Sequence, residues 1–125
     1  MAGKVFYNKL IRDGIEGKIR GLGEDLETRV LEDDQEFQQE LLKKVAEEAN
    51  GLARARTKED FLDEYADLMA VLDALRGALG VSDEEVAAAR AENDKRKGGF
   101  AKRLFLRWSS DTSYKSNETP QGVSS

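Results

Sequence analysis

The fold is decided by residues 34–79, which read DQEFQQELLKKVAEEANGLARARTKEDFLDEYADLMAVLDALRGAL. Two stripes of apolar residues recur in this stretch every three or four positions, namely Phe37, Leu41, Val45, Ala49 and Leu52, then Phe61, Tyr65, Leu68, Leu72, Leu75 and Leu79. Such spacing places each stripe on one face of a helix. The sequence therefore predicts helices over 34–55 and 58–79, and the short break between them predicts an antiparallel pair.

Residues around this pair supply further helix starts and stops. One of the two aspartates at 33–34 is expected to cap the first helix, because a carboxylate accepts hydrogen bonds from free backbone N–H groups. Ser82 and Glu85 form a capping box for a third helix over 83–96, which Gly98-Gly99 ends. The chain is therefore expected to be mainly α-helical.

The segments outside these helices are less regular. Residues 1–32 carry a short helical pattern that is interrupted by glycines, which weaken a helix. Short extended pieces are expected near 28–31 and 102–107, and these two pieces could pair with each other. Residues 109–125 are rich in Ser and Thr with few apolar residues, so we expect a disordered tail there and a single domain over 1–108.

Composition narrows the possible chemistry. The chain has no histidine and no cysteine, which excludes imidazole and thiolate metal sites, serine–histidine hydrolysis and a disulfide framework. Its net charge of −5 argues against nucleic acid as a partner. No apolar run approaches the roughly 20 residues that span a bilayer, and the N-terminus lacks the apolar region of a signal peptide. We therefore expect a soluble, cytoplasmic protein with no membrane partner.

Three carboxylates occupy positions that a solvated helix face does not explain. With Phe37 set at zero, Glu48 falls at about 20°, inside the apolar arc of the first helix. With Phe61 at zero, Glu64 and Asp67 fall at about 300° and 240°, along one edge of the second helix. In an antiparallel pair the three can converge, and converging carboxylates repel unless they are protonated or bridged by a divalent cation. Oxygen ligands favour Mg²⁺ or Mn²⁺.

Periodicity alone leaves simpler alternatives open. Glu48 could pair with an arginine, and Glu64 with Asp67 could form a solvated edge. The neighbouring Glu47 falls at about 280°, off the apolar arc, where it could act as a base that orients a water molecule.

Four motifs stand in order along the chain: Tyr7–Asp13 (YNKLIRD), Lys44–Glu48 (KVAEE), Asp63–Leu68 (DEYADL) and Gly98–Arg103 (GGFAKR). Together they resemble the MazG-like, all-alpha NTP pyrophosphatase superfamily, and in particular its single-domain group related to phosphoribosyl-ATP pyrophosphohydrolase. The resemblance covers about residues 6–107. It implies a helical bundle built on the antiparallel pair, and hydrolysis of a nucleoside triphosphate to a monophosphate and pyrophosphate in nucleotide-pool house-cleaning.

The metal motif of that superfamily is Glu-Glu-x-x-Glu, followed on the next helix by Glu-x-x-Asp. The resemblance implies that Glu47 and Glu48 are catalytic and that Glu48, Glu64 and Asp67 bind Mg²⁺, with Mn²⁺ as an alternative. Gly51 stands where the motif has its third glutamate, which removes one of four expected ligands. The alternative function is therefore a catalytically degenerate module that binds a nucleotide or a protein partner.

The resemblance also implies basic residues that hold the phosphates, and the candidates are Lys9, Arg12, Lys95 and Arg96. Lys9 and Arg12 are expected three apart on a short helix, with Asp13 orienting Arg12. The cluster at Lys95 and Arg96 has an equally good explanation, because cations near a helix C-terminus complement the helix dipole. The family commonly forms dimers or paired dimers, so we expect a homodimer or homotetramer.

Overall fold

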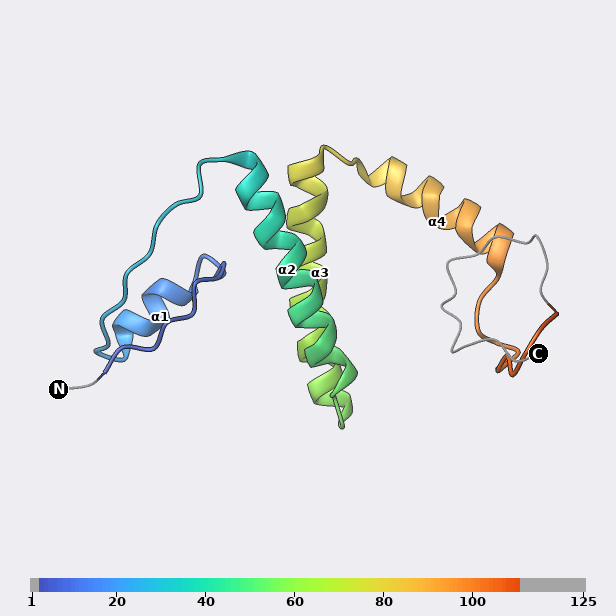
Figure 1. Cartoon of the computed structure of the whole chain (residues 1–125), viewed down its shortest axis with the longest axis horizontal. Helices are drawn as coiled ribbons and strands as arrows, with labels where there is room; N and C mark the ends of the chain where they lie inside the picture. The colour runs from blue at the N-terminus through green and yellow to red at the C-terminus, as the bar shows by residue number, and fades with distance from the viewer. Residues whose placement is uncertain (1–2, 111–125) are drawn as a thin grey trace.

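The computed structural model describes residues 3–110 and contains four helices joined by irregular segments (Figure 1). The helices are α1 Ile15–Gly21, α2 Asp34–Ala53, α3 Lys58–Leu79 and α4 Asp83–Lys97. No strand occurs within residues 3–110. The predicted mainly helical fold is therefore confirmed. Within the same residues, no helix combines the length and the apolar character that crossing a membrane requires.

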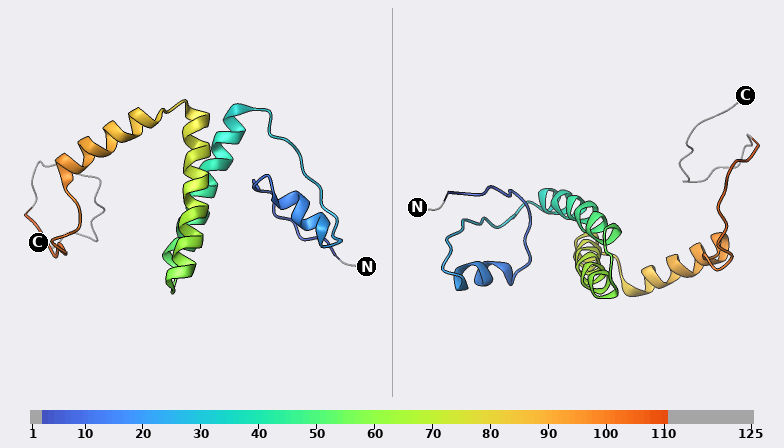
Figure 2. Two further views of the ribbon diagram at one scale, coloured as in Figure 1. Left: turned by 180° about the vertical axis from the view of Figure 1, so that it is seen from behind. Right: turned by 90° about the horizontal axis from the view of Figure 1, so that it is seen from below.

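Helices α2 and α3 form the predicted antiparallel hairpin and lie side by side in both Figure 1 and Figure 2. Leu41 of α2 and Val71 of α3 are its buried centre, with 5% and 8% of their surfaces exposed. At the open end of the hairpin, the side-chain amide of Gln38 donates a hydrogen bond to the carbonyl of Ala78 at 3.2 Å. The hairpin is the one helix–helix contact in the described part of the chain, so the protomer has a small core.

Local capping sets the starts of the two hairpin helices. Asp33, and not Asp34, caps α2: its carboxylate accepts a hydrogen bond from the backbone N–H of Gln35 at 3.1 Å. The Thr57 hydroxyl accepts one from the backbone N–H of Asp60 at 3.0 Å, and this starts α3 at the predicted residue. Helix α2 ends at residue 53 rather than at the predicted 55.

The remaining boundaries also follow local chemistry. Gly80 ends α3 with φ 70°, a left-handed backbone that glycine adopts without steric cost. Ser82 and Glu85 form both hydrogen bonds of the predicted capping box at the start of α4. The helix then ends at Lys97, one residue beyond the predicted range, with Gly98 as its C-cap.

The N-terminal segment departs from the prediction. Helix α1 begins only at Ile15, so Lys9 and Arg12 lie in an irregular segment and the predicted short helix carrying both is wrong. Asn8 has φ 48°, a left-handed conformation that is incompatible with a continuing right-handed helix. This irregular path lets Lys9 and Arg12 reach toward α2 and α3, as described below.

The two segments that were expected to be extended form no strands and do not pair. Figure 2 shows why: the segment joining α1 to α2 lies on one side of the hairpin, and α4 carries residues 100–110 away on the other side. Arg29 instead binds Glu36 in the first turn of α2 with two hydrogen bonds, at 3.1 and 2.7 Å. The expected pairing of 28–31 with 102–107 is therefore wrong within one protomer. Of the expected tail, residues 111–125 lie outside the described residues.

Large apolar side chains remain exposed on this open architecture. On α3 they include Leu62, Tyr65 and Leu79, which are 56%, 47% and 57% exposed. Beyond α4, Phe100 and Trp108 are 96% and 81% exposed. These side chains leave apolar surface uncovered within the described part of the protomer.

Candidate metal centre

The hairpin brings together the three carboxylates that the sequence singled out. Glu48 comes from α2, whereas Glu64 and Asp67 lie one turn apart on α3, and each offers an oxygen within 4.8 Å of the other two. All three are half-buried. Their convergence follows from helix geometry, because Glu48 shares the stripe that faces α3 and the other two share one edge of α3.

Crowding makes this cluster electrostatically unfavourable in the absence of a cation. Burial raises the pKa of Glu48 first, and the negative charge of Asp67 raises it further. The ammonium of Lys44 opposes both effects and lowers the pKa. A divalent cation would relieve the repulsion among the carboxylates, and their hard oxygen atoms are the donors that Mg²⁺ and Mn²⁺ take. The donor set therefore fits such a cation.

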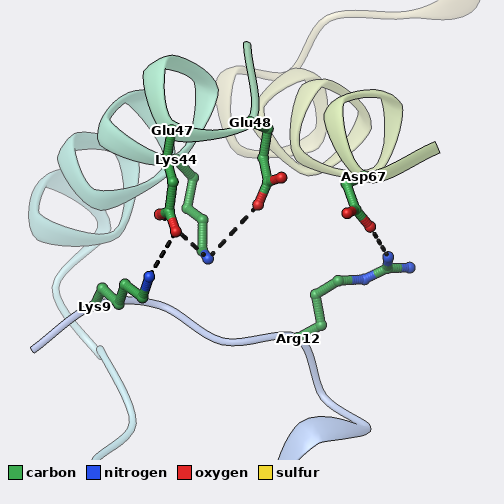
Figure 3. A network of polar contacts seen from close by, with 6 residues as sticks. All are labelled: Lys9, Arg12, Lys44, Glu47, Glu48 and Asp67. Atoms are coloured by element: carbon green, nitrogen blue, oxygen red, sulfur yellow. Dashed lines mark hydrogen bonds and ion pairs between the residues drawn. The ribbon is translucent and has the colours of Figure 1, made fainter. Parts of the chain in front are cut away.

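Lys44 is the site residue that sequence reasoning missed. Its ammonium lies 3.6 Å from a carboxylate oxygen of Glu47 and 3.9 Å from one of Glu48 (Figure 3). Only 15% of its side chain is exposed, so the positive charge is held at the site rather than in solvent. The available signal was its position four residues before Glu48, which places both on one helix face.

The N-terminal segment supplies two more cations. The ammonium of Lys9 donates a hydrogen bond to Glu47 at 2.5 Å, and a guanidinium nitrogen of Arg12 donates one to Asp67 at 3.4 Å (Figure 3). In Figure 3 both side chains point from this segment toward the hairpin. Within the described residues no hydrogen bond joins Arg12 to Asp13, so the expected orientation of Arg12 by Asp13 is replaced by its contact with α3.

Glu47 is next to Glu48 in sequence but is not one of the three converging carboxylates. The hydrogen bond from Lys9 is the largest influence on it and lowers its pKa, while the same bond raises the pKa of Lys9. Glu47 is therefore ionised at neutral pH and shared between the ammonium groups of Lys9 and Lys44. A carboxylate with a lowered pKa is a weaker base, so these contacts restrain its chemistry.

The other two predicted phosphate ligands are not near this cluster. Lys95 and Arg96 lie in the last turn of α4, which points away from the hairpin in Figures 1 and 2. Within one protomer the structure therefore joins Lys9 and Arg12 to the carboxylates but leaves Lys95 and Arg96 apart from them.

Comparisons of the chain with protein-family models, with curated proteins and with solved structures found no match.

Proposed function

We propose that this protein is a divalent-cation-dependent nucleoside triphosphate pyrophosphohydrolase of the MazG-like type, which converts an NTP or dNTP to a monophosphate and pyrophosphate. The observation that carries the proposal is the convergence of Glu48, Glu64 and Asp67 within 4.8 Å. These are the positions that the resemblance assigns to the metal. Three cationic side chains lie at this cluster, as a site for a polyphosphate requires: Lys44 beside Glu48, Arg12 beside Asp67, and Lys9 on the adjoining Glu47.

The proposed cofactor is Mg²⁺, with Mn²⁺ as the alternative, and Glu48, Glu64 and Asp67 are the residues that would hold it. When bound, such a cation neutralises phosphate charge and lowers the pKa of the water that attacks phosphorus. With only three protein ligands, the remaining positions are left to water and phosphate oxygens, an arrangement that Mg²⁺ favours.

The nearby cations would bind the phosphates by exchanging partners. Lys9 and Arg12 are partly exposed and each forms a single ion pair, so a triphosphate can replace Glu47 and Asp67 as their acceptors. Arginine can bind a phosphate through two nitrogens. Once Lys9 has left, the Glu47 oxygen that it occupied is free to accept a proton from the attacking water.

We further propose that the protein works as a homodimer or homotetramer. Support comes from the small core and from the exposed apolar residues of α3, which a second copy would bury. Lys95 and Arg96 lie in the last turn of α4, which leads away from the hairpin, so they would contribute to phosphate binding only at the site of another copy. A monomeric mass in solution would contradict this part of the proposal.

The test is pyrophosphate release from a panel of ordinary, deoxy and modified nucleoside triphosphates, with Mg²⁺, Mn²⁺ or chelator present. We expect metal-dependent formation of monophosphate and pyrophosphate, abolished by Glu48→Gln and by Asp67→Asn while helicity is unchanged. Glu92→Gln, an exposed change on α4, is the matched control and should remain active. Folded protein that releases no pyrophosphate with either metal would instead support the catalytically degenerate, nucleotide-binding alternative.

A further inference from the structure

Gly51 lies at the proposed metal centre, on the side of α2 that faces the carboxylates. It is three residues after Glu48, so the two positions share one helix face. A Cβ atom built on Gly51 would lie 2.5 Å from a carboxylate oxygen of Glu64 and 3.1 Å from its carboxyl carbon. Among the glycines of residues 3–110, Gly51 is the one where an added Cβ would meet another atom within 4 Å.

This close approach has a specific consequence for Glu64. A Cβ atom essentially never lies within 3.0 Å of another heavy atom, and ordinary contact begins at 3.4 Å. Any side chain at position 51 would therefore push the Glu64 carboxylate aside by about 1 Å. The fold would tolerate such a shift, because the atoms that move are the far end of a flexible side chain. A metal site would not tolerate it, because ligand distances are held within about 0.2 Å.

We propose that Gly51 is a positioning residue: the absence of a side chain there lets Glu64 complete a three-carboxylate site for a divalent cation. This inference rests on the proposed metal centre and deepens it. The three-carboxylate site then requires glycine at position 51. Glu64 occupies the space that the side chain of a fourth ligand at this position would need.

A glycine near the end of a helix weakens that helix relative to alanine. The proposal therefore gives Gly51→Ala two effects of opposite sign. We expect the melting temperature in chelator to rise by about 2 to 6 °C. We expect the affinity for Mn²⁺ alone to fall at least about tenfold, because a misplaced ligand weakens the site.

The chain offers a closely matched control. Gly77 lies two residues before the end of α3, just as Gly51 lies two residues before the end of α2, and a Cβ added at Gly77 would meet nothing within 4 Å. Gly77→Ala should therefore raise the melting temperature by a similar amount and leave Mn²⁺ affinity unchanged. Shortening the displaced ligand provides a rescue, so Gly51→Ala combined with Glu64→Asp should bind Mn²⁺ more tightly than Gly51→Ala alone.

The experiment is calorimetric titration of chelator-treated, full-length protein with Mn²⁺ in the absence of nucleotide, together with thermal unfolding in chelator. Equal Mn²⁺ affinity of wild type and Gly51→Ala would overturn the inference and leave the metal centre standing. Tighter binding by Gly51→Glu would also overturn it, because a fourth ligand would then fit. Wild-type protein that binds no Mn²⁺ would overturn the metal centre and this inference together.

Discussion

Replacing Glu48 with glutamine removes one charge from the carboxylate cluster and keeps the shape of the side chain. The half-buried Glu48 carboxylate converges with two like charges, Glu64 and Asp67, and lies near one opposite charge, Lys44. A third like charge, the adjoining Glu47, is offset by its ion pair with Lys9. The substitution should therefore separate the two roles of this residue. It should stabilise the metal-free fold and abolish stabilisation by metal.

The size of the first effect follows from the geometry. At the 4.8 Å that bounds the separation of the carboxylate oxygens, two unit charges repel by about 1 kcal/mol at a dielectric constant near 80 and about 3.5 kcal/mol near 20. Glu48 is repelled by two such carboxylates. Its attraction to the Lys44 ammonium at 3.9 Å offsets roughly one of these two repulsions. The net electrostatic cost of the Glu48 charge is therefore about the energy of one such repulsion. The side chain of Asp67 is 38% exposed, so solvent screens part of this repulsion. We therefore expect Glu48→Gln to raise the free energy of unfolding in chelator by about 1 to 2 kcal/mol.

The assay is urea unfolding followed by far-ultraviolet circular dichroism, in chelator and again with Mg²⁺, at one protein concentration so that assembly does not differ. The free energy of unfolding of wild type should rise by about 2.7 kcal/mol when Mg²⁺ is present at a hundred times its dissociation constant. That of Glu48→Gln should not change when Mg²⁺ is added. Glu92→Gln, the exposed control, should change stability in chelator by less than about 0.5 kcal/mol.

Two results would refute this reasoning. If Glu48→Gln is less stable than wild type in chelator, attraction to Lys44 exceeds repulsion by the other carboxylates. If the variant gains as much stability from Mg²⁺ as wild type does, Glu48 is not a metal ligand.

Removing the charge of Lys44 (Lys44→Gln) should tighten Mn²⁺ binding in titrations without nucleotide, because an ammonium no longer competes for the carboxylates. The control Lys43→Gln, on the exposed side of α2, should leave the Mn²⁺ affinity unchanged. Burial raises the pKa of Glu48, so the charged form of Glu48 destabilises the fold at pH values above that raised pKa. The stability advantage of Glu48→Gln in chelator should therefore shrink as the pH falls toward 4.5, the ordinary pKa of a glutamate. Urea unfolding at a series of pH values measures this change. Lys9→Gln should raise KM for the triphosphate several-fold in the pyrophosphate assay yet alter stability by less than about 1 kcal/mol, because exposed ion pairs contribute little. Tyr65→Arg should lower the solution mass measured by light scattering, and an unchanged mass would exclude this face of α3 from the subunit interface.

Local interactions made much of the fold predictable from sequence. The hydrogen bonds that start α3 and α4 join residues three apart, and the left-handed Gly80 ends α3 by its own backbone preference. Apolar spacing likewise predicted the face of α2 that meets α3, since Leu41 is buried there. On α3 it was only partly right, because Val71 at the edge of the predicted stripe is buried while Tyr65 and Leu79 within the stripe are exposed. The same periodicity placed Glu48 inside the α2 stripe, so the convergence of the three carboxylates could be anticipated before any packing was known.

The N-terminal segment was not predictable in this way. Lys9 reaches Glu47 across 38 residues and Arg12 reaches Asp67 across 55, and no rule of spacing links positions so far apart. Their apolar neighbours suggested a helix, but the left-handed backbone of Asn8 is incompatible with one. Which carboxylate each cation meets depends on where the hairpin lies relative to that segment.

Because helical periodicity and capping act within a few residues, they made the helices after residue 33, their order, the antiparallel hairpin and the convergence of three carboxylates predictable from sequence. Packing between elements is what brings Lys9 and Arg12 to Glu47 and Asp67, sets the Glu64 carboxylate against Gly51, and leaves α4 apart from the hairpin. These features depend on distances of a few ångströms between elements that are far apart in the chain. Such distances are set by how whole helices pack, and they cannot be read from the sequence of each helix alone.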